Sequence, residues 1–479
     1  MVVLKKNIAI IGAGSAGMSA YRAAMEHTDS ILLIEEDRYG TMCARSGCMP
    51  SKLLITASDS AHQARTMGPL GINVGRVDID GGAVMQRVRE ERDRFVGFVV
   101  DTVESWPPQN RLIGRAKFIA PGRLQVGEDI IVEAERIVIA TGSKPNIPAG
   151  WRETLGARLI VNEDIFQWDA LPESVLVVGA GAIGLELAES LARLGVRVKL
   201  LSRGRGIGPL TDPAVLAMAR ALIKGEVSLS EDVEGIAFSL VSGQVRASWN
   251  EASGPCQGAF DYVLAAMGRT ADISGLDVSK AQLALDGKGR LQVNRLTGQV
   301  GDAAVFLAGD AQGARALLHE AIDDGRGAGT NAVNWPNVQP YPRRTPLGIV
   351  FTSPQIAMAG QSHAEITASG AAFVVGELDW SHQGRARIAS QHRGLLRIYA
   401  SRTAGSLLGA EMIGPQSEHL AHLLAWCIQM KLSVAQILEF PFYHPVFEEG
   451  VRTALRHALD QLEATVVPTP APATATALQ

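Results

Sequence analysis

Short apolar runs that end in glycine open the chain. Residues 7–11 and 30–34 are mostly apolar and have the length of a strand, and the residues between them follow a helical pattern to about Glu26. The second run ends in Glu35, and the glycines after the first run are Gly12, Gly14 and Gly17. Apolar runs bounded by glycine are typical of buried strands. We therefore predict a strand, a tight turn, a helix and a second strand.

This pattern is the fingerprint of a dinucleotide-binding unit. Its three glycines permit the tight turn, the approach of the backbone to a pyrophosphate and the close packing of helix on strand, and the carboxylate of Glu35 would bind ribose hydroxyls. The pattern returns at residues 174–186 with Gly179, Gly181 and Gly184. Two units predict two bound dinucleotides, or one dinucleotide bound twice. A chance glycine-rich turn would explain only one of them.

Later apolar runs extend this α/β pattern. Ile137–Gly142 and Tyr262–Gly268 are interpreted as strands that end against a ligand, and Val305–Asp310 as a strand with a carboxylate at its carboxyl end. A helical pattern covers residues 85–103. From about Thr345 the sequence pattern changes to a series of strands followed by helices, which predicts a separate α+β domain. Its expected elements are strands at Leu347–Ala357, Leu395–Tyr399 and Leu407–Ile413 and helices from Gln416.

Composition is that of a soluble globular protein. The chain has 479 residues, 47% of them hydrophobic and 20% charged, which is enough for about three domains. A net charge of −4 without a basic run argues against a nucleic-acid partner. Lys5 and Lys6 break the first strand, so we expect no signal peptide, and no run has the length and hydropathy of a membrane span. We expect a cytoplasmic protein with no membrane partner.

Two of the four cysteines, Cys43 and Cys48, lie close together between the first glycine pattern and a helical pattern. A helix N-terminus favours a thiolate and lowers the pKa of a thiol. We therefore predict a redox-active dithiol beside a dinucleotide, and not two cysteines that are close by chance. Cys256 and Cys427 are isolated, and the apolar helical run around Cys427 predicts a buried structural thiol. One catalytic disulfide fits a reducing cytoplasm.

His444 and Glu449 form a second candidate pair. They are too far apart for one helical turn, but a turn at Pro445 followed by the start of a helix would bring them together. A carboxylate on one ring nitrogen fixes the tautomer of a histidine. That arrangement suits a base that takes a proton from a thiol. The alternative is a helix N-terminus with ordinary surface charges.

Together these motifs resemble the pyridine nucleotide–disulfide oxidoreductases, and among them the dihydrolipoamide dehydrogenases most. The resemblance covers about residues 7–461 and rests on the order of several motifs along the chain. They are the two glycine fingerprints, Cys43-x4-Cys48-x-Pro-Ser-Lys52, Ala140-Thr-Gly142, Met267-Gly-Arg269, Ala308-Gly-Asp310 and His444-Pro…Glu449. Motifs in a fixed order are more specific than any one of them alone.

The resemblance implies an α/β fold with two Rossmann-like dinucleotide-binding domains, for FAD and NAD(P), and a C-terminal α+β dimerisation domain. It places the FAD-binding domain at residues 1–145 and 270–342 and the NAD(P)-binding domain at 146–269. The dimerisation domain would cover residues 343–463 and make the protein a homodimer. Residues 464–479, rich in Pro, Ala and Thr, are expected to form a disordered tail.

It also implies a role for each candidate residue. Cys48 faces the flavin, Cys43 exchanges with the substrate, and His444 of the partner subunit moves the proton while Glu449 orients it. Lys52 and Glu186 form an ion pair beside the flavin ring. The expected FAD contacts are Gly12, Gly14, Gly17, Glu35, Lys52, Ala116, Gly142 and Asp310. Those of the nicotinamide nucleotide are Gly179, Gly181, Gly184 and Gly268. No metal site is expected.

Two departures from the family bear on specificity. Ser202 stands where lipoamide dehydrogenases usually carry a glutamate for the NAD ribose, and Arg203 and Arg205 follow it. Two guanidinium groups suit a 2′-phosphate, so NADP(H) is favoured over NAD(H). The alternative is two exposed arginines, with NAD bound by other contacts. Arg45 lies between the cysteines, where a cation could stabilise a thiolate or contact an anionic substrate.

The leading hypothesis is a dihydrolipoamide dehydrogenase-like flavoprotein that acts on lipoyl groups carried by a partner protein. The alternative is an NADPH-dependent reductase of a small disulfide such as glutathione. The Pro-Ser-Lys run after Cys48 resembles the lipoamide branch, whereas Ser202 with Arg203 resembles the glutathione branch. A non-catalytic flavoprotein scaffold is disfavoured, because binding alone does not require Cys43, Cys48, His444 and Glu449.

Overall fold

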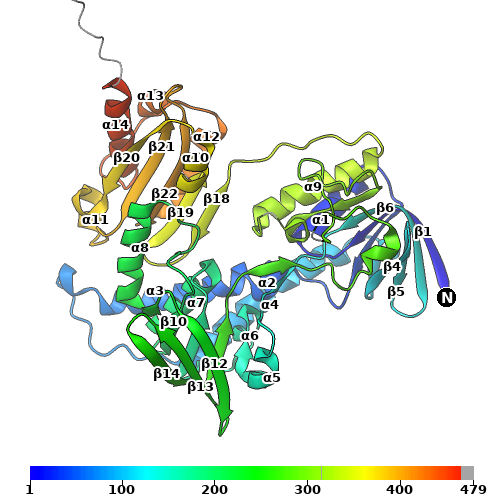
Figure 1. Ribbon diagram of the computed structural model, residues 1–479, viewed down its shortest axis with the longest axis horizontal. Coiled ribbons are helices and arrows are strands. Elements are labelled where there is room, and N and C mark those ends of the chain that lie inside the picture. The colour runs from blue at the N-terminus through cyan, green and yellow to red at the C-terminus, as the bar shows by residue number, and fades with distance from the viewer. Residues whose placement is uncertain (288, 314, 465–479) are drawn as a thin grey trace, which may run out of the picture.

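Three lobes, each with its own sheet, make up the computed structural model, which describes residues 1–287, 289–313 and 315–464 (Figure 1). Two lobes contain mainly parallel sheets with helices, and the third contains an antiparallel sheet. The predicted α/β class is therefore confirmed. The tail predicted for residues 464–479 lies, from residue 465 on, outside the described residues.

The glycine-rich start of the chain forms the first lobe. Its strands are β1 (Val2–Ile11), β2 (Ile31–Glu35), β3 (Arg111–Ile113), β4 (Ala116–Ala120), β5 (Arg123–Val126), β6 (Ile130–Ile139) and β17 (Val305–Leu307). Its helices are α1 (Ser15–Met25), α2 (Met42–Ser46) and α9 (Leu318–Asn334), while α3 (Cys48–Arg65) and the start of α4 (Gly81–Glu104) pack on the core of the second lobe. The strand order is β3-β2-β1-β6-β5-β4, with β17 paired to β6. β1 runs parallel to both β2 and β6, as the strand–helix–strand pattern requires.

The second lobe repeats this arrangement. The chain enters it through β7 (Ser143–Pro145) and leaves it through β16 (Arg269–Ala271), which pair antiparallel. Its parallel sheet has the order β11-β10-β9-β15-β8, and a separate antiparallel sheet, β12-β13-β14, was not predicted. The strands are β8 (Leu159–Ile160), β9 (Ser174–Val178), β10 (Arg197–Leu201), β11 (Ser228–Ser230), β12 (Glu234–Val241), β13 (Gln244–Glu251), β14 (Gly254–Phe260) and β15 (Tyr262–Ala265). The helices are α5 (Trp151–Leu155), α6 (Asn162–Ile165), α7 (Ala182–Arg193) and α8 (Pro213–Glu226).

The third lobe is the predicted α+β unit. Its sheet has the order β18-β19-β22-β21-β20, with strands at β18 (Leu347–Val350), β19 (Gln355–Gly360), β20 (Phe373–Asp379), β21 (Leu395–Ser401) and β22 (Leu407–Gly414). The helices are α10 (His363–Ser369), α11 (Gly384–Ile388), α12 (Ser417–Gln429), α13 (Val434–Leu438) and α14 (Glu449–Glu463). Cys427, expected to be buried, is only half-buried in α12.

One predicted strand is wrong. Leu347–Ala357 is not continuous but is divided between β18 and β19, which pair antiparallel across a turn at residues 351–354. Pro354 lacks the N–H that a central strand needs, so it marks the break. The turn points to α7, where it meets two carboxylates, as described below.

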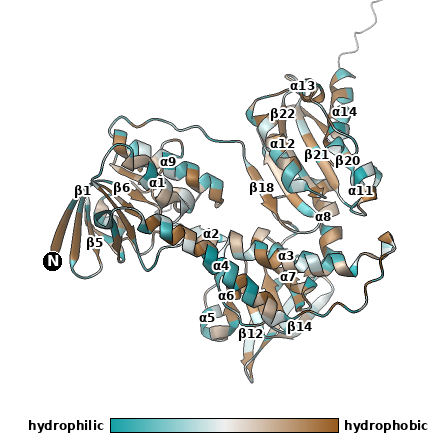
Figure 2. Ribbon diagram, turned by 180° about the vertical axis from the view of Figure 1, so that it is seen from behind, coloured by the Kyte–Doolittle hydropathy of each residue, from teal (hydrophilic) through white to brown (hydrophobic). Residues whose placement is uncertain are grey.

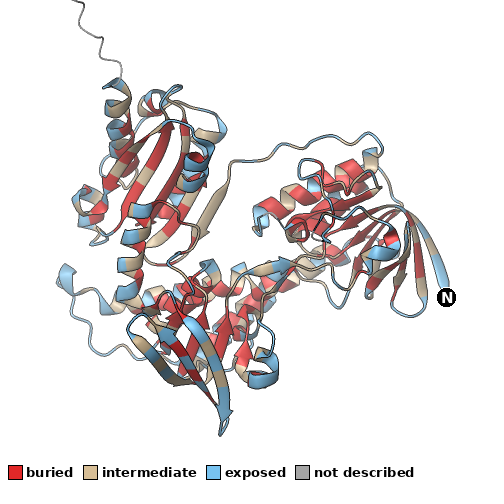
Figure 3. Cartoon of the chain, viewed as in Figure 1, coloured by how far each residue is buried: buried red, intermediate tan, exposed pale blue. Residues whose placement is uncertain are grey.

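Hydrophobic residues are frequent along the strands (Figure 2), and the strands form much of the buried centre of each lobe (Figure 3). The carboxyl ends of parallel strands share one edge of a sheet, where α/β folds bind ligands. In the first lobe the residues at this edge are Gly12 after β1, Glu35 at the end of β2, Gly142 after β6 and Asp310 after β17. The topology therefore brings together residues that lie far apart in the sequence.

A buried polar contact joins the second lobe to the third, where α8 packs against β21 and β22. Glu411 of β22 is fully buried, and its carboxylate accepts hydrogen bonds from the backbone N–H groups of Thr211 at 2.6 Å, Asp212 at 2.8 Å and His363 at 2.8 Å. A buried carboxylate with several donors is well satisfied. The contact fixes the start of α8 against the third sheet.

None of the described helices combines the length and the hydropathy that crossing a lipid bilayer requires.

Candidate active site

The first glycine fingerprint forms a cradle that fits the ADP half of FAD. Gly12 has φ +101°, and a Cβ at this residue would lie 2.4 Å from the carbonyl oxygen of Ala140. A Cβ on Gly14 would meet no described atom within 4 Å, because it would point into open space. The Glu35 carboxylate accepts a hydrogen bond from the Ala13 N–H at 2.7 Å. Among the described residues no side chain caps α1, so its first N–H groups face this space and can bind a phosphate.

A cavity of about 270 Å³ lies over this cradle. Its lining includes Gly12, Gly14, Glu35, Ala116 and Gly142, all of them predicted contacts of the cofactor. Gly17 does not line it, and a Cβ there would lie 1.8 Å from the Gly12 carbonyl oxygen. Its part is therefore the close packing of helix on strand.

The second fingerprint repeats the geometry. Gly179 has φ +116°, and a Cβ there would lie 2.3 Å from the carbonyl oxygen of Ala266, whereas Gly181 faces open space among the described atoms. A Cβ on Gly184 would lie 1.9 Å from the Gly179 carbonyl oxygen. A cavity of about 350 Å³ lies beside these residues, and Gly268 lines it. This cavity suits a second dinucleotide.

The two arginines after Ser202 differ in their surroundings. Ser202 is buried, and its backbone pairs with Ser230. Arg203 is exposed and lines the nucleotide cavity. The Arg205 Nε instead donates to Asp232 Oδ2 at 2.5 Å, outside that cavity. Of the two arginines expected to contact a 2′-phosphate, only Arg203 lines this cavity, and the contact itself stays a prediction.

The dithiol spans two helices. Cys43 lies in the short α2, whose start is capped by the Thr41 hydroxyl, and Cys48 is the first residue of α3. The hydrogen bond from the Cys43 thiol and the charge of Lys52 outweigh burial and lower the pKa of Cys48 to about 7. The same hydrogen bond, with burial, raises the pKa of Cys43. The two shifts make Cys48 the more acidic thiol of the pair.

Lys52 is the cation beside Cys48. Its Nζ lies 2.8 Å from Oε2 and 3.1 Å from Oε1 of Glu186, so the structure brings this predicted pair together. The Arg45 guanidinium instead donates to the Tyr39 carbonyl oxygen. It does not take the thiolate-stabilising place considered from the sequence.

A cavity of about 200 Å³ joins the dithiol to Asp310. Asp310 Oδ2 accepts a hydrogen bond from the Ser143 hydroxyl at 2.7 Å. Arg269, which the sequence supplied only as part of a motif, lines the same cavity and donates from Nη2 to the Ser143 carbonyl oxygen at 2.7 Å. Asn162 was not among the residues predicted from the sequence. Its amide donates to the carbonyl oxygen of Ser46 at 2.9 Å and so holds the end of α2 in place. No local sequence signal identifies Asn162.

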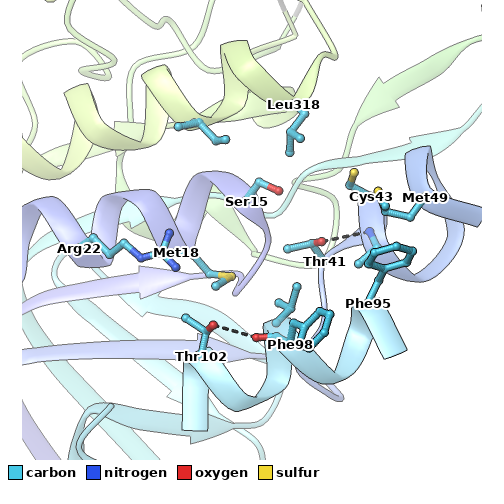
Figure 4. A pocket seen from close by; sticks show the side chains of 13 residues that line it. Ser15, Met18, Arg22, Thr41, Cys43, Met49, Phe95, Phe98, Thr102 and Leu318 are labelled. Carbon is cyan, nitrogen blue, oxygen red and sulfur yellow. Dashed lines mark hydrogen bonds between the residues drawn. The ribbon is translucent and has the colours of Figure 1, made fainter. Parts of the chain in front are cut away.

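A second cavity, of about 400 Å³, also reaches Cys43 (Figure 4). Its walls come from α1, α2, α3, α4 and α9, and most of its side chains are apolar or aromatic: Met18, Met49, Phe95, Phe98, Val99, Leu318 and Ile322. Arg22 is the cation in the lining. The dithiol is therefore reached from two cavities, one shared with Asp310 and one largely apolar.

His444 and Glu449 meet as the sequence analysis proposed. Glu449 begins α14, and His444 Nδ1 lies 3.0 Å from its Oε2. Burial would raise the pKa of Glu449, but hydrogen bonds from His444 and from the Val446 N–H hold it below its usual value. The His444 side chain is 80% exposed. It is therefore free to serve a site outside its own lobe.

Comparisons with known proteins agree with this architecture. The family model for pyridine nucleotide-disulphide oxidoreductases matches residues 6–325, and the model for their dimerisation domain matches residues 347–455. A dihydrolipoyl dehydrogenase of Haloferax volcanii is 30% identical over 94% of this chain and 96% of its own, and dihydrolipoyl dehydrogenase 2 of Haloarcula marismortui is 29% identical over 93% and 95%. The flavoprotein disulfide reductase RclA of Escherichia coli has the same fold, with a TM-score of 0.80 and 22% identity over 94% of this chain and 99% of that chain.

Proposed function

This chain belongs to the pyridine nucleotide-disulphide oxidoreductase family, and from that membership we propose that it exchanges electrons between NADP(H) and a lipoyl-type disulfide on a partner protein. The family establishes an FAD-dependent, NAD(P)-linked disulfide oxidoreductase that forms a homodimer. The disulfide substrate, the preference for NADP(H) and the roles of individual residues are the proposal.

Bound FAD supplies two-electron exchange between the nicotinamide and the dithiol. Cys43, reached from the apolar cavity, exchanges with the substrate sulfur through a mixed disulfide. The Cys48 thiolate then attacks the Cys43 sulfur, which forms the Cys43–Cys48 disulfide and releases the second substrate thiol. Because the pKa of Cys43 is raised, its proton must pass to a base, and His444 of the partner subunit is that base.

The observation that carries the lipoyl assignment is the apolar cavity beside Cys43. A lipoyl group presents its ring disulfide on a long aliphatic chain, and the side chains of Phe95, Phe98 and Met18 offer that chain an apolar wall. Burial of each methylene contributes about 0.8 kcal/mol. A peptide disulfide would bring charged and amide groups to the same wall at a desolvation cost. The relatives named dihydrolipoyl dehydrogenase support the same choice.

NADP(H) is favoured by the residues after β10. Ser202 supplies no carboxylate for ribose hydroxyls, and the Arg203 guanidinium lines the cavity where a 2′-phosphate would lie. A guanidinium binds phosphate through paired, charge-assisted hydrogen bonds.

A small anionic disulfide, such as that of glutathione, is the second candidate. Arg22 is exposed and lies in the lining of the cavity that reaches Cys43, with its Cζ 5.7 Å from the centre of the Trp106 ring. A cation at this place could bind a substrate carboxylate. The position of Arg22 in this cavity favours an anionic substrate over neutral lipoamide.

Steady-state rates with lipoamide and with glutathione disulfide, each with NADPH and with NADH, distinguish the two candidates. We expect turnover with lipoamide and a KM for lipoamide that rises about tenfold in Phe98→Ala, since the ring forms part of the proposed wall. The matched variant Arg22→Gln should leave lipoamide turnover unchanged. Turnover with glutathione disulfide alone, lost in Arg22→Gln, would replace the lipoyl assignment by the second candidate.

A further inference from the structure

Lys52 contacts a residue of the third lobe as well as Glu186. Its Nζ lies 4.3 Å from the centre of the Phe351 ring. Phe351 comes from the turn between β18 and β19, a segment that the sequence pattern had assigned to a continuous strand. The ammonium group is thus held between a carboxylate of α7 and an aromatic face. The C-terminal lobe therefore reaches the dithiol region of its own subunit, independently of His444.

Three hydrogen bonds from the backbone of the turn join it to α7. The Phe351 N–H donates to Glu186 Oε1 at 3.0 Å, and the Ser353 N–H donates to Glu189 Oε1 at 2.8 Å. The Ser353 carbonyl oxygen accepts from Arg193 Nη2 at 2.8 Å. These backbone hydrogen bonds remain available whatever side chain residue 351 carries. The aromatic ring is therefore not needed to hold the turn and is available to act on Lys52.

We propose that Phe351 is a positioning residue that keeps the Lys52 ammonium beside Cys48 and shields it from water, so that the third lobe adjusts the reactivity of the dithiol in its own subunit. A cation over an aromatic face is attracted by the ring quadrupole, and more strongly where water is excluded. The Lys52 side chain is 35% exposed, and the ring covers one side of it, which limits the screening of its charge by water.

The groups that face Cys48 come from three helices. The hydrogen bond from Cys43 of α2 and the positive charge of Lys52 of α3 both lower the pKa of Cys48. The negative charge of Glu186 of α7 raises it. Without the Phe351 ring, Lys52 gains water and can shift toward solvent, while Glu186 remains held by the backbone N–H of residue 351. The positive charge of Lys52 then stabilises the Cys48 thiolate less, while the negative charge of Glu186 still destabilises it. The pKa of Cys48 should rise.

The test is the rate of iodoacetamide labelling at Cys48 in the dithiothreitol-reduced holoenzyme, followed from about pH 5 to pH 9 and assigned by mass spectrometry of the Cys48 peptide. In Phe351→Leu, which keeps an apolar side chain but no ring, labelling below neutral pH should slow by about threefold to tenfold and its profile should move to higher pH. Phe351→Tyr keeps the aromatic face and should retain the wild-type profile. Lys52→Met, the positive control, should shift the profile in the same direction and at least as far.

Two results would overturn the proposal: an unshifted profile in Phe351→Leu, or equal shifts in Phe351→Leu and Phe351→Tyr. If Phe351→Leu does not fold, Glu189→Gln offers a second route, because it weakens the anchor at the Ser353 N–H and leaves the ring in place. It should give a smaller shift in the same direction, and no shift would count against the proposal. The inference rests on the proposed dithiol and not on the substrate. Labelling requires no disulfide substrate and no nicotinamide, so failure of the lipoyl assignment leaves this test unaffected.

Discussion

His444 Nδ1 lies 3.0 Å from Glu449 Oε2. The side chain of His444 is 80% exposed, whereas that of Glu449 is 14% exposed. An ionised carboxylate can only accept a hydrogen bond, so Nδ1 is the donor, and in the neutral imidazole the lone pair is on Nε2. Arg452 also donates to Glu449, from Nη2 to Oε1 at 2.7 Å, and restricts the carboxylate further. The pair is assembled within one lobe, yet most of the histidine side chain is exposed.

His444→Gln should lower disulfide turnover by about a hundredfold or more, the contribution typical of a general base. Reduction of the flavin by the nicotinamide, followed by its absorbance, should be unchanged because His444 takes no part in that half-reaction. Glu449→Gln keeps a hydrogen-bond acceptor and should lose less activity than Glu449→Ala. Equal loss of both half-reactions in His444→Gln would contradict the proposed role of this residue as the base.

A site shared between subunits can be restored by mixing two inactive variants. Homodimers of Cys43→Ser and homodimers of His444→Gln should both lack disulfide turnover. A heterodimer of the two variants contains one site with both native residues, so it should regain up to about half of the wild-type activity. Purified heterodimers carrying two different tags allow this measurement. No activity in the heterodimer would show that Cys43 and His444 act within one subunit.

Arg203→Ala should raise the KM for NADPH by about tenfold and leave the KM for NADH nearly unchanged. The reason is that the lost guanidinium would contact only the 2′-phosphate. Arg205→Ala is the matched control, because Asp232 already pairs with this arginine outside the cavity. Its effect on the KM for NADPH should be smaller. An unchanged KM for NADPH in Arg203→Ala would remove the basis for an NADP(H) preference.

The stability of the reduced protein should depend on pH through Cys48. Its folded pKa, about 7, lies below the ordinary thiol value of 9.0. A depressed acid pKa stabilises the folded state fully above the unfolded value, and this contribution is lost as the pH falls through the folded value. The Tm of reduced wild type, relative to that of Cys48→Ser, should therefore rise between about pH 7 and pH 9. A difference that is constant over this interval would argue against a native thiolate at Cys48.

Glu411→Ala should loosen the second lobe from the third. It would leave buried N–H groups of Thr211, Asp212 and His363 without their acceptor, at a cost of about 3 kcal/mol. Thermal unfolding and limited proteolysis between the lobes measure the effect. Glu418→Ala is a suitable control on the same lobe, since Glu418 is partly exposed and pairs with Gln355. Equal Tm values in wild type and Glu411→Ala would contradict this role.

Local sequence determined the elements around the cofactor sites. The glycine fingerprints predicted both strand–turn–helix units, because only glycine accommodates the positive φ and the close carbonyl contacts at Gly12 and Gly179. Position relative to a helix start identified Cys48, and the turn at Pro445 was enough to bring His444 to Glu449. These features depend on neighbours a few residues apart, so they can be recognised in the sequence.

Tertiary structure decided what depends on distant segments. The pairing of Arg205 with Asp232, which separates it from Arg203, follows from how the chain returns after α8. The apolar wall beside Cys43 forms where α1, α3, α4 and α9 converge. Phe351 looked like a residue within a strand, yet its turn bonds to α7 and places the ring over Lys52. Contacts between segments that lie so far apart are set by the packing of whole lobes, to which a short stretch of sequence gives no signal.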